Sequence, residues 1–142
     1  MITVYVTKTY RFNAGHRLFD PRRDDRWNLD VFGKCSYPGG HGHNYSLEVT
    51  LRGEPDPASG RVLAVSRLDA IVAEEVFARL DHRNLNEVLP KEYGPAPTTE
   101  VLVLELWKRI SKGIPAPSIL HRLRVSETDK NSFEYFGPVH AS

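Results

Sequence analysis

The alternation of hydrophobic and polar residues predicts strands near both ends of the chain. From Ile2 to Ala14, hydrophobic side chains occupy almost every second position, and mostly polar residues stand between them. A period of two is typical of a strand with one buried face. A second run alternates in the same way from Asn44 to Arg52 and ends at Gly53. The sequence therefore predicts two strands, joined by a polar segment (residues 17–40) that is too long for a tight hairpin turn.

Hydrophobic residues recur at helical spacing in two central segments. In the first segment they are Leu68, Ile71, Val72, Val76 and Leu80. In the second they are Val103, Leu106, Trp107 and Ile110. Ser66 and Asp69 have the pattern of a capping box at the start of the first helix. Thr98 or Thr99 is expected to cap the second helix, which ends at Gly113.

Strand patterns return after the second helix. Leu123, Val125 and Glu127 share one face of a third strand, and residues 132–136 form a short fourth strand. Two strands, two helices and two strands predict an α+β fold, with a four-stranded antiparallel sheet and both helices on one face. Such a sheet leaves its edges and other face open, so we expect self-association.

The composition indicates a single domain of nearly neutral charge. A chain of 142 residues is the size of one domain, and we assign residues 1–142 to it. With 19 basic and 18 acidic residues, it lacks the broad positive field that favours nucleic acids or anionic membrane surfaces. We therefore expect neither as a partner. The absence of a long apolar run or signal-like N-terminus predicts a cytoplasmic protein, and the single cysteine excludes an internal disulfide.

Three of the six histidines have the phase of buried strand positions. His41 and His43 lie at the start of the second strand, so both side chains project to the face that holds Tyr45. His16 shares the phase of Ala14 in the first strand. Three imidazoles at the ends of adjacent strands can hold zinc with a fourth position open, and nitrogen ligands suit zinc better than magnesium or calcium. The alternative is that they are hydrogen-bonding surface histidines.

Four other polar residues have positions that suggest chemistry. Cys35 precedes the second strand and is a fourth zinc ligand, a reactive thiolate or an inert thiol; a polar loop beside a cationic site favours the thiolate. Asp81 and His82 follow the first helix, where they either support proton transfer or simply end the helix. Glu127 lies on the apolar face of its strand, and a carboxylate there needs a partner unless the strand end reaches solvent.

Taken together, these motifs resemble those of the 6-pyruvoyl-tetrahydropterin synthase family. They are FNAGHRL with His16, KCSYPGGHGHNY with Cys35, His41 and His43, LDHRNLN with Asp81 and His82, PTTE from Thr98 to Glu100, and SETD with Glu127. Each motif is weak by itself, but five in order with compatible spacing make the resemblance specific. It extends over residues 10–136.

The resemblance implies a role for each of these residues. Zinc would be bound by His16, His41 and His43. Cys35 would transfer protons with the help of Asp81 and His82. Glu127 would anchor the pterin ring, and the secondary candidates for the pterin pocket are Thr98, Thr99 and Glu100.

The resemblance also implies an assembly and a substrate. The expected architecture is the tunnelling fold, in which ββααββ subunits join their sheets into a barrel and active sites form between neighbours, as a trimer or hexamer. The expected substrate is 7,8-dihydroneopterin triphosphate, converted to 6-pyruvoyl-tetrahydropterin with loss of triphosphate and without an external redox cofactor. Arg11, Arg17 and Lys34 flank the site motifs and are candidates for contacting the triphosphate.

Two other functions are open at this point. Related enzymes form 6-carboxy-tetrahydropterin on the queuosine route or cleave the pterin side chain, but the five residues between Cys35 and His41 resemble the pyruvoyl-forming type. A non-enzymatic zinc-stapled oligomerisation domain would leave Glu127 and the Asp81–His82 pair without a role.

One departure from the family pattern is Ala64, where Asp or Asn is usual, and we expect Ser66 to cap the helix instead.

Overall fold

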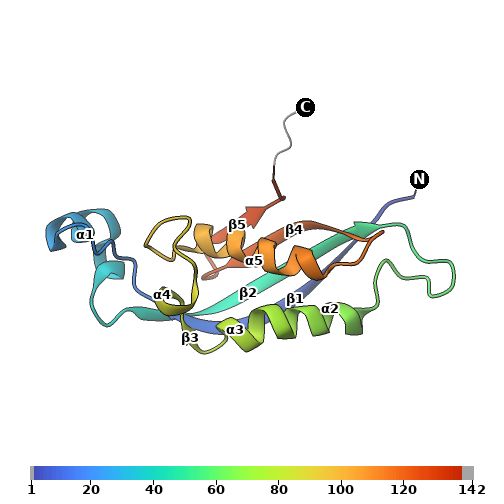
Figure 1. The fold of residues 1–142 in the computed structure, drawn as a ribbon, viewed down its shortest axis with the longest axis horizontal. Helices are drawn as coiled ribbons and strands as arrows, with labels where there is room; N and C mark the ends of the chain where they lie inside the picture. Colours follow the sequence, from blue (N-terminus) through green and yellow to red (C-terminus); the bar gives the residue numbers. More distant parts are fainter. Residues whose placement is uncertain (1, 139–142) are drawn as a thin grey trace.

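A five-stranded sheet with the order β3-β1-β2-β4-β5 forms the frame of the molecule in the computed structural model, which describes residues 2–138 (Figure 1). The strands are β1 (Val4–His16), β2 (His41–Gly53), β3 (Arg83–Asn84), β4 (Ile119–Ser126) and β5 (Ser132–Tyr135). Neighbouring strands from β1 through β2 and β4 to β5 are antiparallel. The predicted α+β class is confirmed, and the long strands follow the alternating pattern.

The prediction of a four-stranded, wholly antiparallel sheet is wrong because of β3. This two-residue strand runs parallel to β1 and pairs with Ala14 and Gly15. The preceding residues secure it: the His82 backbone N–H donates to the Asn13 carbonyl at 2.6 Å, and the Asp81 carboxylate accepts from the Asn13 backbone N–H at 2.8 Å. A strand of this length has no hydrophobic period, so its sequence carries no strand pattern.

Helices cover one face of the sheet (Figure 1). The first long helical segment is nearly continuous and consists of α2 (Val65–Val72), a π-helical turn η2 (Ala73–Phe77) and α3 (Ala78–Leu80). After the short helix α4 (Leu85–Val88), α5 (Thr99–Gly113) forms the second long helical segment. The apolar sides of these helices and the inward residues of the long strands form a single hydrophobic core. None of the helices within residues 2–138 has the length and hydropathy to cross a bilayer.

The first long helix does not begin with the predicted capping box. Its N-cap is Ala64, which has no side-chain capping bond, so Ser66 does not replace the missing cap. Asp69 instead accepts hydrogen bonds from the Lys8 ammonium at 2.6 Å and from the Tyr10 hydroxyl at 2.7 Å. The carboxylate thus bonds to β1 rather than to its own helix, a tertiary contact that local spacing does not reveal.

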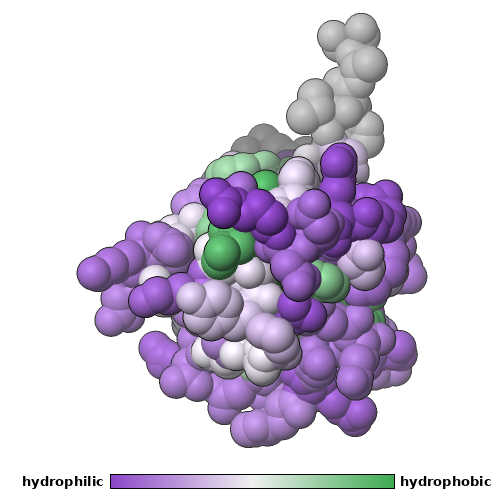
Figure 2. Space-filling view, turned by 90° about the vertical axis from the view of Figure 1, so that its left-hand side faces the viewer, coloured by the Kyte–Doolittle hydropathy of each residue, from purple (hydrophilic) through white to green (hydrophobic). Residues whose placement is uncertain are grey.

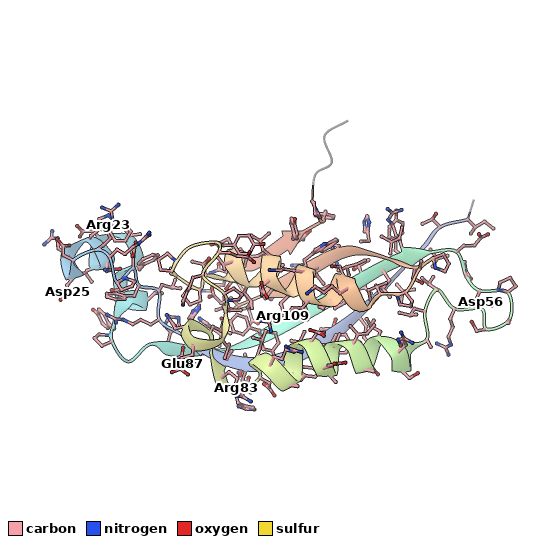
Figure 3. All side chains as sticks on the ribbon, in the orientation of Figure 1. Arg23, Asp25, Asp56, Arg83, Glu87 and Arg109 are labelled. Atoms are coloured by element: carbon pink, nitrogen blue, oxygen red, sulfur yellow. The ribbon has the colours of Figure 1, made fainter. Side chains whose placement is uncertain are left out.

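The polar segment between β1 and β2 is folded rather than irregular. It contains α1 (Asp25–Phe32) and the 3₁₀ turn η1 (Gly33–Ser36). Asp24 caps α1 by accepting from the Trp27 N–H at 2.7 Å, and the buried Asn28 side chain bonds to both backbone groups of Asp20. This end of the molecule is mainly hydrophilic, with small separate hydrophobic patches (Figure 2). Asp56, between β2 and α2, lies at the opposite end (Figure 3).

The other face of the sheet carries polar side chains and is not covered by the helices. Thr7 and Thr50 share a hydrogen bond of 2.7 Å across β1 and β2. Glu48 lies 3.6 Å from the Arg122 guanidinium and 3.5 Å from that of Arg124. A face of this composition matches the open face expected from the sequence, while the barrel assembly stays a prediction.

Candidate active site

The register of β1 and β2 brings the three predicted histidines together. His16 lies opposite His41, and Ala14 lies opposite His43. Because side chains alternate along a strand, all three imidazoles project toward the helix-covered face at one end of the sheet. Their ligand nitrogens lie within 4.8 Å of one another, and the Nε2 atoms of His16 and His41 are 2.9 Å apart. The expected clustering of the three side chains is therefore present.

The orientation of His16 is set by the segment that leads into α5. Its Nδ1 lies 2.8 Å from the carbonyl oxygen of Pro97, and both residues are buried. A carbonyl only accepts hydrogen bonds, so Nδ1 must carry the proton and Nε2 must present its lone pair to the cluster. Such a second bond fixes both the tautomer and the ring plane of a metal-binding histidine.

His43 presents a buried ring nitrogen without a partner. Within residues 2–138, its Nε2 atom makes no hydrogen bond. Burial lowers the pKa of both His43 and His16, and the neighbouring imidazoles lower it further, so both rings are neutral at pH 7. Neutral imidazoles with inward lone pairs are the donors that zinc takes, and an ion would satisfy the orphaned nitrogen. The three residues therefore fit a zinc ion.

A carboxylate lies beside the histidines. Glu127 directly follows β4, and its Oε1 atom is 3.3 Å from His43 Nε2 and 3.6 Å from His16 Nε2. The hydroxyl of Thr99, a buried residue at the start of α5, donates to the same oxygen at 3.0 Å. The carboxylate thus faces inward and has a partner, as its position on the apolar face of the strand predicted.

A cleft of about 570 Å³ opens next to His16 and His41. Arg17 and Arg83 contribute cationic side chains to its lining, and Asn84 and Asn86 contribute amides. The Arg17 side chain is well held, because its Nε donates to the Ser36 carbonyl at 2.7 Å and its guanidinium lies 3.7 Å from the centre of the Phe19 ring. An anionic group adjacent to the histidines would meet positive charge here.

The chain matches the family model described as "6-pyruvoyl tetrahydropterin synthase" over residues 5–138. It belongs to the 6-pyruvoyl tetrahydropterin synthase family. A 6-pyruvoyl tetrahydrobiopterin synthase from Poecilia reticulata is 41% identical over 133 residues, which cover 94% of this chain and 90% of the relative. The resemblance seen in the motifs is therefore confirmed.

Two further proteins are similar to this chain. The structure of Caenorhabditis elegans 6-pyruvoyl tetrahydropterin synthase matches with a TM-score of 0.89 at 34% identity, covering 97% of this chain and 98% of that one. A dihydroneopterin monophosphate aldolase from Pyrococcus furiosus is 37% identical over 94 residues, 66% of this chain and 75% of the relative.

The segments expected to carry the family's proton-transfer residues lie around the histidine cluster. Cys35 is half-buried in η1, where its carbonyl accepts from the Leu18 N–H at 2.8 Å, and it is not one of the clustered metal-ligating groups. The exposed His82 side chain lies 3.7 Å from the Asp81 carboxylate. His82 lines a different hollow from the cleft of His16 and His41. His43 lines the same hollow as His82, and Arg83 lines both hollows, so the hollow of His82 adjoins the cleft of His16 and His41.

One member of the PTTE segment contacts Glu127. Thr99 contacts Glu127 as described, whereas the Thr98 hydroxyl caps α5 by accepting from the Val101 N–H at 3.3 Å. The predicted helix cap is thus confirmed for Thr98. Glu100 is exposed on the first turn of α5, where the helix dipole favours a negative charge.

The basic residues near the family motifs do not all lie beside the histidines. Arg11 is exposed on β1 between two buried neighbours, so it faces away from the histidines, and Lys34 is exposed on η1. Of the three expected cations, Arg17 alone is among the residues that line the cleft. Arg83, which the motif analysis did not select, also lines it and extends outward from the sheet edge (Figure 3). Its position directly after the Asp81–His82 pair was the available signal.

A buried tyrosine was also missed among the site residues. Tyr45 is fully buried behind His43, and its hydroxyl has no hydrogen-bond partner within residues 2–138. Burial, reinforced by the Glu127 carboxylate, raises its pKa, so the hydroxyl is a protonated donor. The strand pattern assigned Tyr45 to the core, and only the three-dimensional placement of Glu127 brings it to the site.

Proposed function

We propose that this protein is a zinc-dependent lyase that converts 7,8-dihydroneopterin triphosphate to 6-pyruvoyl-tetrahydropterin and releases triphosphate. Family membership supports the lyase class of reaction. The observation that carries the proposal is a cluster of three imidazole nitrogens within 4.8 Å of one another, with the Glu127 carboxylate 3.3 Å from one of them. This arrangement combines a metal site with an acceptor for ring N–H groups.

His16, His41 and His43 would hold the zinc ion. When bound, zinc supplies Lewis-acid chemistry, which acidifies the hydroxyl groups and adjacent C–H bonds of a coordinated substrate side chain. The bond from His16 to Pro97 would keep one ligand in its binding tautomer.

Glu127 would bind the pterin ring. The pterin's amino group and adjacent ring N–H form a pair of donors that a carboxylate can accept together. Because Thr99 already donates to one carboxylate oxygen, the orientation of the acceptor is set before the ligand arrives. The short distance to His43 would place the reacting side chain of the ring beside the metal ligands.

Proton transfer would require a second subunit. We assign the base to Cys35 as a thiolate, with Asp81 and His82 moving protons between the base and solvent. His82 shares a hollow with His43, whereas Cys35 lines neither this hollow nor the cleft of His16 and His41, so a neighbouring copy would complete the set of proton-transfer groups. We therefore propose a homo-oligomer, a trimer or hexamer, with sites between subunits. Arg17 and Arg83 would contact the triphosphate.

The deciding experiment is incubation of the protein with 7,8-dihydroneopterin triphosphate, followed by mass analysis of the products. Release of triphosphate with every side-chain carbon retained identifies the pyruvoyl-forming reaction. Acetaldehyde would identify the 6-carboxy-tetrahydropterin branch instead. Turnover of no pterin at all, by protein that contains its metal, would contradict the proposal and favour a zinc-stapled binding domain.

A side-chain-cleaving activity is the second candidate. The similarity to the dihydroneopterin monophosphate aldolase supports it, although that match covers a smaller part of the chain than the synthase matches do. Aldol cleavage would shorten the pterin side chain and release a two-carbon aldehyde fragment. The same mass analysis, repeated with dihydroneopterin monophosphate as substrate, separates this activity from the synthase reaction.

A further inference from the structure

The hydroxyl of Tyr45 forms no stabilising hydrogen bond within the part of the chain that the structure describes. The residue has an exposed fraction of 0%, and its hydroxyl makes no hydrogen bond within the part of the chain that the structure describes. A buried polar group without a partner costs stability, so a phenylalanine of the same shape would be the better core residue. An orphaned hydroxyl therefore indicates a partner that is made elsewhere in the functional cycle.

The register of β2 and β4 indicates that Tyr45 faces Glu127. In the ladder between β2 and β4, Leu47 pairs with Val125 and Ser46 pairs with Ser126. The ladder ends at this pair, and continuing its register by one residue would set Tyr45 across from Glu127, on the face that holds the histidines. Directly opposite residues have Cβ atoms about 5 Å apart and interact through their side chains.

The neighbouring rings keep Tyr45 in this position. Its ring stacks on Phe12, with centroids 5.1 Å apart and planes at 18°, and meets the edge of His43 at 5.6 Å. Thr99 and Glu127 are polar neighbours of its hydroxyl. The ring cannot move its hydroxyl to solvent without disrupting this packing, so new partners must arise within the site.

We propose that Tyr45 is a positioning residue of the ligand site, whose hydroxyl donates a hydrogen bond to the Thr99–Glu127 pair when a ligand with two adjacent N–H groups engages Glu127. This inference rests on the proposed role of Glu127 as the ring-binding carboxylate. Thr99 Oγ1 donates its proton to Glu127 and keeps lone pairs to accept from Tyr45. The result is a chain of donors from Tyr45 through Thr99 to the carboxylate. Such a chain would hold the carboxylate aligned with the ligand.

The test compares Tyr45→Phe with Tyr10→Phe, two variants that each remove the hydroxyl of a buried tyrosine. Tyr10 is also buried, but its hydroxyl donates to Asp69 at 2.7 Å, away from the histidines. Binding of neopterin is measured by the change in its fluorescence, and metal content and thermal unfolding are measured for each protein. KM and kcat are then determined with 7,8-dihydroneopterin triphosphate.

Tyr45→Phe is expected to weaken neopterin binding and to raise KM by about tenfold or more, the effect of losing a hydrogen bond that supports a charged group. Its kcat is expected to change little, because the ring contact is the same in ground and transition states. Its melting temperature and zinc content should equal or exceed those of the wild type. Tyr10→Phe should show the opposite split, with a lower melting temperature and unchanged neopterin binding.

Two outcomes would overturn the inference, and they are distinguishable. Wild-type affinity and KM in a folded, zinc-containing Tyr45→Phe protein would show that the hydroxyl has no positioning role while leaving the proposed function intact. If the wild-type protein itself neither binds neopterin nor converts the triphosphate, the proposed function fails and this inference fails with it.

Discussion

The Nε2 atom of His16 faces the Nε2 atom of His41 at 2.9 Å, while the other ring nitrogen of His16 donates to the Pro97 carbonyl. The inward nitrogen of His16 therefore carries a lone pair. His43 adds a buried nitrogen that makes no hydrogen bond in the described part of the chain. An ion between these atoms would be coordinated by the lone pair of His16 and would satisfy the unpaired nitrogen of His43.

The first prediction concerns metal content. Purified wild-type protein should contain about one zinc ion per chain, the expected stoichiometry of a His₃ site. His43→Ala should lose most of this zinc on dialysis, because it removes one of three protein ligands. His121→Ala removes a histidine that packs against Tyr5, away from the cluster, and should retain the ion. Equal zinc in both variants, measured by elemental analysis, would exclude the assigned site.

The second prediction separates the thiol from the metal site. Cys35→Ala should keep its zinc, because Cys35 is not one of the clustered ligand groups. Its triphosphate release should fall by about 100-fold or more, the usual effect of removing a general base. Elemental analysis and a phosphate-release assay on the same preparation test both statements. Loss of zinc together with Cys35 would instead indicate a closed site with a thiolate ligand.

The third prediction distinguishes a ring anchor from a metal ligand at Glu127. Glu127→Gln should retain zinc but bind neopterin about tenfold or more weakly, because the amide lacks the charge that strengthens bonds from ligand N–H groups. Glu54→Gln, in an exposed position just after β2 and at the opposite end of that strand from the histidines, is the matched control and should bind neopterin normally. Zinc loss in Glu127→Gln would assign the carboxylate to the metal instead.

The fourth prediction follows from the lowered pKa values of His16 and His43, whose ordinary value is 6.5. In metal-free protein, both rings stay neutral at a pH where they become protonated after unfolding. The free energy of unfolding should therefore be constant above pH 6.5 and decrease as the pH falls below it, toward the folded-state pKa values. Urea unfolding of chelator-treated protein from about pH 8 to about pH 5 measures this slope.

His43→Ala provides the control for this pH dependence. It removes one of the two groups with a lowered pKa, so its stability should decrease less steeply over the same range. An identical slope in the two proteins would show that other groups control the acid sensitivity.

The fifth prediction concerns the turn before His41. Gly40 has a φ of +65°, and a Cβ atom there would lie 2.9 Å from the His16 carbonyl oxygen. Gly40→Ala should destabilise the protein by about 1–3 kcal/mol and reduce zinc retention, because the turn must shift away from β1. At Gly39 a Cβ would meet no atom within 4 Å, so Gly39→Ala should change neither. Thermal unfolding and metal analysis compare the two, and equal melting temperatures would contradict the steric argument.

Most of the sheet and the cluster of three histidines could be predicted because their determinants are local. The alternation of residues along β1 and β2 indicated which side chains face the core, and His16, His41 and His43 shared that phase. Thr98 likewise caps α5 from within its own motif. The inward position of Glu127 followed from its place after Leu123 and Val125 on one face of the strand.

Other features depend on contacts between distant segments, and sequence spacing does not contain them. Asp69 bonds to β1 instead of capping its helix, and β3 exists because Asp81 and His82 bind the backbone of Asn13. Arg17 and Arg83 line the cleft, although nothing in the motif spacing favoured Arg17 over Arg11.

The sequence by itself determined the α+β class, the family and the three clustered histidines, because periodicity and motif order are written along the chain. Only the tertiary structure decided how these parts meet: the bond from His16 to Pro97, the approach of Glu127 to His43, and the unpartnered hydroxyl of Tyr45 opposite it. Each of these relationships depends on strand register and helix placement. Both are set when distant hydrophobic faces pack together into one core, so no single segment of the sequence specifies them.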